Sequence, residues 1–147
     1  MKKNVITYGT FDTFHYGHME LLNRAKKLGN HLTVAVSTDE FNTVKGKTCM
    51  FSYDKRVEWV KSLKSVDRVI SENNWDQKCL DLVNYDIDIF VMGNDWNGKF
   101  DFLSKLCKVV YLNRTDDISS TDIKKMQKQS FLKKIFDAIK ERIGNVN

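Results

Sequence analysis

The sequence contains no proline and only three cysteines among its 147 residues. Cys49, Cys79 and Cys107 are widely separated and form no Cys-x-x-Cys pair, and an odd number of cysteines cannot close into a complete set of disulfides. This pattern is typical of reduced thiols, and it argues against a disulfide scaffold or a cysteine-based metal site. The absence of proline has no evident physical cause.

The chain also lacks an apolar run of about 18 residues, the length that a membrane-spanning helix requires. Met1-Lys2-Lys3 leads straight into a short apolar segment, without the apolar core of a signal peptide. We therefore expect a soluble, cytoplasmic protein. With 41% hydrophobic and 29% charged residues, a chain of this length is expected to form one domain with its own core.

The charge balance is mildly basic, with 24 Lys and Arg residues against 19 Asp and Glu residues. A solvated lysine surface and an attraction for small polyanions account for this excess equally well. No dense Lys/Arg cluster with interleaved aromatic residues is present, so we expect no nucleic-acid partner.

Short apolar runs alternate along the chain with segments of helical periodicity. The runs are residues 5–8, 32–36, 66–70, 87–92 and 108–112, and the helical segments are about 18–28, 53–63, 76–84 and 99–106. This alternation predicts an α/β protein made of βαβ units with right-handed crossovers and a parallel sheet of about five strands. Ligands bind beyond the carboxyl ends of such strands, and polar residues follow four of the five runs. The pattern therefore predicts one ligand site at that edge.

The first predicted strand and the following helix are joined by Gly9-Thr10-Phe11-Asp12-Thr13-Phe14-His15-Tyr16-Gly17-His18. Unpaired backbone N–H groups and the positive end of the helix dipole make such a junction a ready anion site. His15 and His18 stand three residues apart at this junction. Two imidazoles beside an anion-binding helix start suggest chemistry on phosphate.

Two further loops carry candidate binding residues. Lys45 and Lys47 lie in a loop expected over residues 39–53, where they could close over phosphates, although an ordinary solvated loop explains them too. Asp95 could accept a hydrogen bond from a ribose hydroxyl or a base amino group, and Trp96 could line a base pocket. Gly-Asn-Asp is also ordinary turn chemistry, so the second assignment has a plain alternative.

The segment after the last predicted strand begins with Arg114, which can hold phosphate oxygens in a bidentate manner. Ser119 or Ser120 is expected to cap a helix there, and hydroxyls beside free N–H groups would make a second phosphate cradle. An ordinary capping motif is the alternative.

The end of the chain has apolar residues at helical spacing with lysines between them: Phe131, Leu132, Ile135, Phe136, Ile139 and Ile143. We expect an amphipathic helix that packs on the domain or on a dimer partner. Peripheral contact with a membrane surface is the alternative, because basic amphipathic helices make such contacts.

The pattern Gly-Thr-Phe-Asp-x-x-His-x-Gly-His over residues 9–18, followed by Arg-Thr-Asp-Asp-Ile-Ser-Ser-Thr over residues 114–121, resembles the cytidylyltransferase-like nucleotidyltransferases. The resemblance runs from about residue 3 to residue 125 and is nearest to members that act on glycerol 3-phosphate. It implies a Rossmann-like, doubly wound fold that usually forms a homodimer. We divide the chain into a nucleotidyltransferase domain, 1–128, and a C-terminal helical extension, 129–147.

The resemblance implies transfer of a cytidylyl group from CTP to sn-glycerol 3-phosphate, giving CDP-glycerol for a teichoic-acid-like or capsular polymer and releasing pyrophosphate. It also implies Mg²⁺ held mainly by the CTP phosphates, with no protein residue assigned to the metal. Ribitol 5-phosphate, phosphocholine and phosphoethanolamine remain as other acceptors, and a non-catalytic nucleotide-binding module remains as another class. Lys45 and Lys78 favour a phosphorylated polyol, whereas a choline enzyme needs an aromatic or acidic cage.

The resemblance also implies roles for individual residues. The catalytic group is His15, His18, Lys47 and Arg114. The nucleotide-binding group is Gly9, Thr10, Phe11, Tyr16, Gly17, Lys47, Arg56, Gly93, Asp95, Arg114, Thr115, Ile118, Ser119, Ser120 and Thr121. Asp12, Lys45 and Lys78 are assigned to the acceptor.

One position and one segment depart from the family pattern. Asp117 stands where the family has glycine, which adds a negative charge near the expected triphosphate. The segment 64–69 differs from the family pattern near the family's usual dimer contact.

Overall fold

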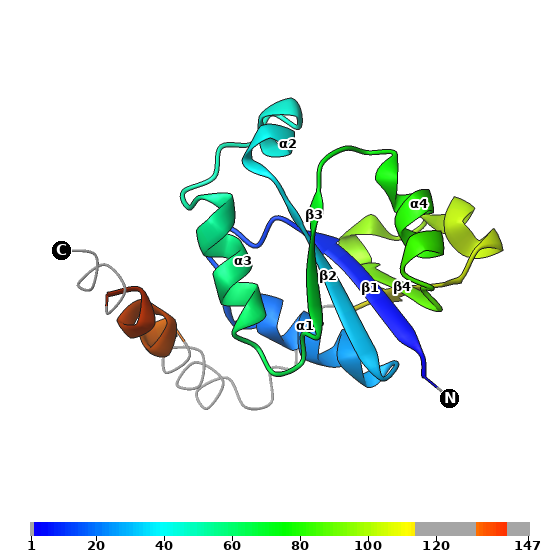
Figure 1. The fold of residues 1–147 in the computed structure, drawn as a ribbon, viewed down its shortest axis with the longest axis horizontal. Helices are drawn as coiled ribbons and strands as arrows, with labels where there is room; N and C mark the ends of the chain where they lie inside the picture. Colours follow the sequence, from blue (N-terminus) through cyan, green and yellow to red (C-terminus); the bar gives the residue numbers. More distant parts are fainter. Residues whose placement is uncertain (1, 114–131, 141–147) are drawn as a thin grey trace.

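A parallel five-stranded sheet organises the chain in the computed structural model, which describes residues 2–113 and 132–140 (Figure 1). The strands are β1 (Asn4–Gly9), β2 (His31–Ser37), β3 (Arg68–Glu72), β4 (Ile89–Gly93) and β5 (Lys108–Leu112). They lie in the order β3-β2-β1-β4-β5, and every neighbouring pair is parallel. The strand order reverses direction at β1, so the predicted doubly wound sheet is confirmed.

Both faces of the sheet are buried, which explains why the strands read as unbroken apolar runs. Val5, Val34 and Val91 belong to a core cluster shared with α1 (Tyr16–Lys27) and α3 (Tyr53–Lys61). Ile6 and Phe90 alternate with them and belong to a second cluster shared with α4 (Gln77–Asn84). Figure 1 shows α1 and α3 on one side of the sheet and α4 on the other.

Two segments of secondary structure differ from the prediction. Part of the expected loop after β2 is a short helix, α2 (Asp39–Val44), because Thr38 caps it by accepting a hydrogen bond from the Phe41 N–H at 3.1 Å. A helix of six residues is too short to show a clear periodicity in the sequence. The predicted helix over 99–106 is instead the 3₁₀ helix η2 (Asp101–Lys105), which follows another short one, η1 (Asn94–Trp96).

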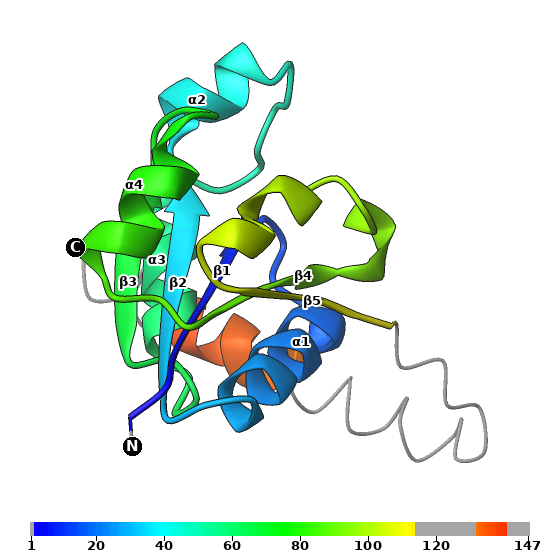
Figure 2. The ribbon, with the colours of Figure 1, turned by 90° about the vertical axis from the view of Figure 1, so that its right-hand side faces the viewer.

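The third strand begins and ends two residues later than the apolar run indicated. Val66 packs against the first core cluster from outside the strand, while β3 continues to Glu72 beside Ser37 of β2. Glu72 therefore lies at the carboxyl edge of the sheet. In Figure 2, α2 and the loop after it lie above this edge.

The described part of the C-terminal tail, residues 132–140, is a helix as predicted. Ile135 and Ile139, one helical turn apart, pack against the core cluster shared with α1 and α3, so this helix packs on its own domain. The expected second phosphate cradle and the two ends of the tail lie outside the described residues. None of the helices in residues 2–113 and 132–140 is long and apolar enough to cross a bilayer.

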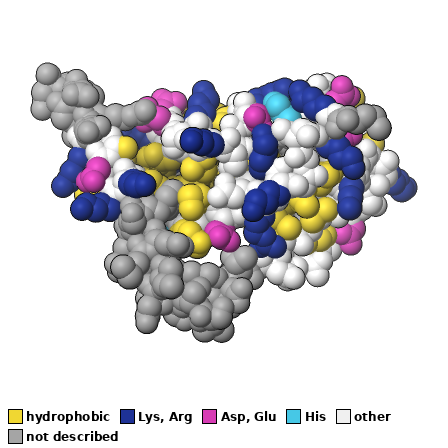
Figure 3. Space-filling model, turned by 90° about the horizontal axis from the view of Figure 1, so that it is seen from below, with side chains coloured by type: hydrophobic (Ala, Val, Ile, Leu, Met, Phe, Trp, Pro, Cys, Tyr) yellow, Lys and Arg dark blue, Asp and Glu magenta, His cyan; other side chains and the backbone are white. Residues whose placement is uncertain are grey.

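The mild excess of positive charge is distributed rather than gathered on the face drawn in Figure 3. Lys and Arg side chains lie there among acidic, polar and apolar ones.

We expect Ile139→Ser to lower the stability of the protein, because it removes half-buried apolar surface from the contact between the tail helix and the first cluster. The free energy of unfolding should fall by about 1 kcal/mol. Phe136→Ser is the matched control, since Phe136 is on the same helix and its side chain is 62% exposed. Chemical denaturation of both variants checks this, and equal stability would show that the helix does not contribute to the core.

Candidate active site

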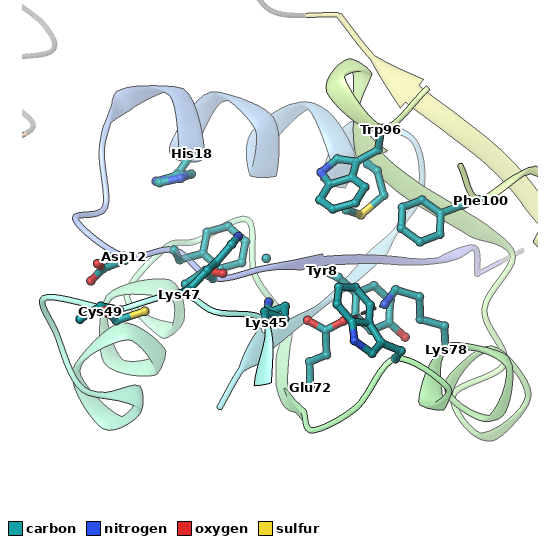
Figure 4. A pocket seen from close by; sticks show the side chains of 16 residues that line it. Tyr8, Asp12, His18, Lys45, Lys47, Cys49, Glu72, Lys78, Trp96 and Phe100 are labelled. Atoms are coloured by element: carbon teal, nitrogen blue, oxygen red, sulfur yellow. Dashed lines mark hydrogen bonds and ion pairs between the residues drawn. The ribbon is translucent and has the colours of Figure 1, made fainter. Parts of the chain in front are cut away.

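A cavity of about 560 Å³ opens where β1, β3 and β4 end. Its walls come from the carboxyl ends of these strands, from the loops that follow them, from the loop after α2 and from the first turn of α1 (Figure 4). The lining residues are Tyr8, Gly9, Thr10, Phe11, Asp12, His18, Lys45, Lys47, Thr48, Cys49, Glu72, Trp75, Lys78, Met92, Trp96 and Phe100. The site therefore lies at the edge that the parallel sheet predicted.

The cavity brings together many of the residues that the sequence singled out. They are Gly9, Thr10, Phe11, Asp12, His18, Lys45, Lys47, Lys78 and Trp96. The remaining described candidates do not line it: His15, Tyr16, Gly17, Arg56, Gly93 and Asp95. Arg114, Thr115, Ile118, Ser119, Ser120 and Thr121 lie outside the described residues.

The loop after β1 has an unusual backbone. Phe11 and Thr13 have φ values of 56° and 44°, in the left-handed region that non-glycine residues seldom adopt. The position just before this loop favours glycine, because a Cβ at Gly9 would lie 2.8 Å from the Phe11 ring. Non-glycine residues in this conformation store strain that the surrounding structure must hold.

Asp12 supplies part of that restraint. Its Oδ2 accepts a hydrogen bond from the Met50 N–H at 2.8 Å, and its Oδ1 accepts one from the Phe51 N–H at 3.0 Å. Both carboxylate oxygens thus join the loop after β1 to the loop before α3. In the protein without substrates, Asp12, which the family pattern assigns to the acceptor substrate, therefore connects two walls of the site.

The two histidines cap helix α1 with their own side chains. Nδ1 of His15 accepts a hydrogen bond from the Gly17 N–H at 3.0 Å, and Nδ1 of His18 accepts one from the His15 N–H at 3.2 Å. In a neutral imidazole the nitrogen that accepts carries no proton, so both rings hold their proton on Nε2. A Cβ at Gly17 would lie 2.8 Å from the His15 ring, which explains the glycine between the histidines.

The setting of His18 keeps it neutral at physiological pH. Its ring lies in an aromatic group, with centroid distances of 3.9 Å to His15, 5.4 Å to Phe11 and 5.3 Å to Phe14. Burial, followed by the charge of His15, lowers the pKa of His18 from 6.5 to about 4. His18 therefore presents an uncharged Nε2–H donor at the cavity wall.

The loop after α2 brings two ammonium groups to the cavity, those of Lys45 and Lys47. Nζ of Lys45 lies 4.6 Å from the centre of the Phe41 ring. Partial burial lowers the pKa of Lys45, and the charges of Lys47 and Lys78 lower it further, while Glu72 opposes them. Three ammonium groups against the two carboxylates of Asp12 and Glu72 leave the cavity with an excess of positive charge, which makes it receptive to a polyanion.

Arg56 lies behind the cavity, with its side chain fully buried. Its Nη1 donates to the carbonyl oxygens of Thr10 and Ser37 at 2.8 and 2.7 Å, and its Nε donates to that of Phe51 at 3.1 Å. Its Nη2 forms an ion pair with Asp39 at 2.8 Å. The guanidinium thereby connects the ends of β1 and β2 with the loop before α3.

The opposite wall is aromatic and contains a buried ion pair. Nζ of Lys78 lies 2.8 Å from Oε2 of Glu72, and both side chains are 5% exposed. The Tyr8 hydroxyl donates to Asp81 at 2.7 Å, and its burial together with this bond raises its pKa. Figure 4 shows Lys78, Tyr8 and Phe100 on one side of the cavity, away from Asp12 and His18.

The prediction from the sequence did not include several residues that line the cavity, chiefly Tyr8, Glu72, Trp75 and Phe100. Tyr8 and Glu72 lie at the carboxyl ends of β1 and β3, so the rule that ligands bind at this edge could have found them. Trp75 and Phe100 carry no comparable signal, because each reaches the cavity from an irregular segment.

We expect Arg56→Lys to destabilise the protein by about 3 kcal/mol and to weaken ligand binding, because one ammonium cannot reach all four acceptors in the planar arrangement that a guanidinium provides. Arg68→Lys is the matched control, since Arg68 is exposed and lies 5.0 Å over the Tyr85 ring. Thermal unfolding and nucleotide titration of both variants check this. A lysine at position 56 that leaves both measurements unchanged would contradict the connecting role.

Within the part of the chain that the structure describes, His, Cys, Asp and Glu side chains form no group of three or more that could hold a metal ion. The described cysteines Cys49, Cys79 and Cys107 are all free thiols, as the sequence predicted.

Comparison with known proteins gives consistent results. The cytidylyltransferase-like family model matches residues 6–126. The glycerol-3-phosphate cytidylyltransferase of Bacillus spizizenii is 58% identical over 123 residues, which cover 84% of this chain and 95% of that protein. The enzyme of the same name from Staphylococcus aureus is 53% identical over 122 residues, covering 83% of this chain and 92% of that protein.

A solved structure agrees with the fold. The lipopolysaccharide core biosynthesis protein of Thermoplasma volcanium superposes with a TM-score of 0.70 at 28% identity, covering 79% of this chain and 100% of that one. The family model spans most of the sequence, including the junction with the two histidines. This chain belongs to the cytidylyltransferase-like family.

Proposed function

We propose that this protein transfers a cytidylyl group from CTP to sn-glycerol 3-phosphate. A phosphate oxygen of the acceptor attacks the α-phosphorus of CTP, the bond from that phosphorus to the β-phosphate breaks, and pyrophosphate leaves with CDP-glycerol as the other product. One observation carries the proposal: the neutral His18 donor and the ammonium groups of Lys45 and Lys47 line the same cavity. The high identity to two enzymes named for this reaction supports the choice of substrates.

The reaction needs little acid–base chemistry, because the acceptor phosphate is already an anionic nucleophile. Catalysis then depends on positioning the two phosphates and on stabilising charge in the transition state. We assign the Nε2–H groups of His15 and His18 to oxygens on the reacting phosphorus. Lys47 balances the triphosphate charge, and Lys45 and Lys78 face the acceptor.

The remaining assignments rest on the family pattern. Arg114, Thr115, Ile118, Ser119, Ser120 and Thr121 would complete the triphosphate site. Gly9, Thr10, Phe11, Tyr16, Gly17, Gly93 and Asp95 would surround the nucleotide. The buried contacts of Arg56 and the two backbone hydrogen bonds that Asp12 accepts support a positioning role for both in the free protein. A homodimer and contact of the tail helix with a membrane surface remain predictions.

Mg²⁺ would enter with the nucleotide and neutralise charge on the departing pyrophosphate. The phosphate oxygens would supply most of its ligands, as Mg²⁺ prefers. The cavity fits this arrangement, because Asp12 already accepts two backbone hydrogen bonds and the ammonium groups beside it favour phosphate.

We expect purified protein with Mg²⁺ to release pyrophosphate only when CTP and glycerol 3-phosphate are both present. The assay crosses CTP, ATP, UTP and GTP with glycerol 3-phosphate, ribitol 5-phosphate, phosphocholine and phosphoethanolamine. Turnover of CTP with another acceptor would keep the chemistry and overturn the proposed acceptor. Absence of turnover in every combination would favour a nucleotide-binding module instead.

We expect His18→Ala to lower kcat by about 10²- to 10³-fold with the fold intact, because it removes a donor to the transition state. His18→Gln is the matched comparison, since its amide can donate from near the position of Nε2 and should retain more activity. Circular dichroism and thermal unfolding check the fold of both. Near-normal turnover of the alanine variant would remove the catalytic role.

We expect His18 of the free protein to titrate with a pKa of about 4, well below its usual 6.5, because burial disfavours the imidazolium. Above pH 6.5 His18 is neutral in both the folded and the unfolded state, so the shift does not affect stability there. Between pH 6.5 and 4 the unfolded chain binds the proton and the folded state does not, so stability falls as the pH is lowered. Nitrogen-15 NMR of the imidazoles measures both the pKa and the Nε2–H tautomer. A midpoint near 6.5, or a proton on Nδ1, would contradict the assignment.

A further inference from the structure

The ammonium of Lys78 lies inside a cage of aromatic rings. Its Nζ is 4.8 Å from the ring centre of Tyr8, 5.7 Å from that of Trp75 and 5.5 Å from that of Phe100. Each distance is within the range over which a cation is attracted to an aromatic face. Glu72 adds a carboxylate 2.8 Å from the same nitrogen. The four partners come from three separate parts of the chain, because Glu72 and Trp75 lie close together at the end of β3 and just after it, while Tyr8 and Phe100 lie far from them in the sequence. The cage is therefore built by the fold.

Three aromatic rings and a carboxylate are the chemistry by which proteins recognise a quaternary ammonium ion. Here the cage lines the cavity proposed to hold the substrates, and the chain's own lysine fills it. The filled cage cannot admit a trimethylammonium group, because the space and the negative ring faces are already used. The same lysine neutralises Glu72 at this wall, so that no uncompensated carboxylate repels a phosphorylated polyol.

We propose that Lys78 determines acceptor specificity by occupying a cage that would otherwise bind a quaternary ammonium group. The inference rests on the proposed function for its place in catalysis, since it assumes that the acceptor meets this wall. It deepens that function by giving a physical reason why choline-type acceptors are excluded. The aromatic rings stabilise the lysine ammonium, and the lysine side chain occupies the space between the rings.

A matched pair of variants tests the proposal without catalysis. Lys78→Ala removes the ammonium and empties the cage, whereas Lys78→Met removes the ammonium and keeps the cage filled with an unbranched chain. Both leave Glu72 without its cation, so they differ only in the space available. The probe is tetramethylammonium chloride, compared with sodium chloride at equal ionic strength. Intrinsic tryptophan fluorescence, to which Trp75 and Trp96 contribute from the cavity, and the thermal unfolding temperature report binding.

We expect Lys78→Ala to bind tetramethylammonium at least about tenfold more tightly than Lys78→Met and the unchanged protein. Equal affinities across the three proteins would overturn the proposal, as would binding of the probe by the unchanged protein at the affinity of the alanine variant. If the unpaired Glu72 prevents folding, the same two substitutions are compared with Glu72→Gln present in both. Removing the carboxylate leaves the three rings and therefore the same expected order.

A negative result in the binding test does not imply a negative result in the assay of cytidylyl transfer, and the reverse also holds. Tetramethylammonium binding needs neither CTP nor turnover, so a negative result would leave the proposed reaction standing. Conversely, failure to release pyrophosphate with glycerol 3-phosphate would leave the cage and its occupant measurable by the same titration. Turnover of phosphocholine by the unchanged protein would overturn the proposal directly.

Discussion

The site depends on one buried guanidinium. Arg56 donates to carbonyl oxygens at the end of β1, at the end of β2 and in the loop before α3, and it pairs with Asp39. Loops at a sheet edge have no ladder of hydrogen bonds to fix them, so their positions depend on such cross-connections. A charge buried in this way must satisfy its donors, and here three of the four acceptors are backbone carbonyl groups. Two of these belong to segments that line the cavity, and the third lies at the end of β2. Because the buried guanidinium needs these acceptors, it holds the segments that carry them in fixed positions beside the cavity.

The histidine junction solves a related problem at the start of α1. The first N–H groups of a helix need acceptors, and the rings of His15 and His18 provide them through Nδ1. This capping fixes the tautomer of each ring. Nδ1 accepts the capping hydrogen bond, and Nε2–H is left to donate to the substrate. Aromatic neighbours then keep His18 uncharged, with a pKa of about 4. A neutral donor suits a site where lysines already provide positive charge.

The two sides of the cavity use cations differently. Lys47 is exposed on the loop side, where it can follow phosphates as they move. Lys78 is almost completely buried among rings and Glu72, so it acts as a fixed charge and a filled volume. A mobile cation serves a triphosphate that must enter and leave, whereas a fixed cation suits selection between acceptors of similar size.

The sequence by itself determined the alternating strands and helices, the edge of the sheet that carries the site and the histidine-bearing junction. These depend on local periodicity and on residues close together in the chain. It placed Lys45, Lys47, Lys78 and Trp96 in the site, but it missed the partners that define their surroundings. Only the tertiary structure decided that Arg56 is a buried connector, that β3 reaches Glu72 and that Tyr8, Trp75 and Phe100 enclose one ammonium. Contacts between residues far apart in the chain follow from how the layers pack, and that packing leaves no periodic signal in the sequence.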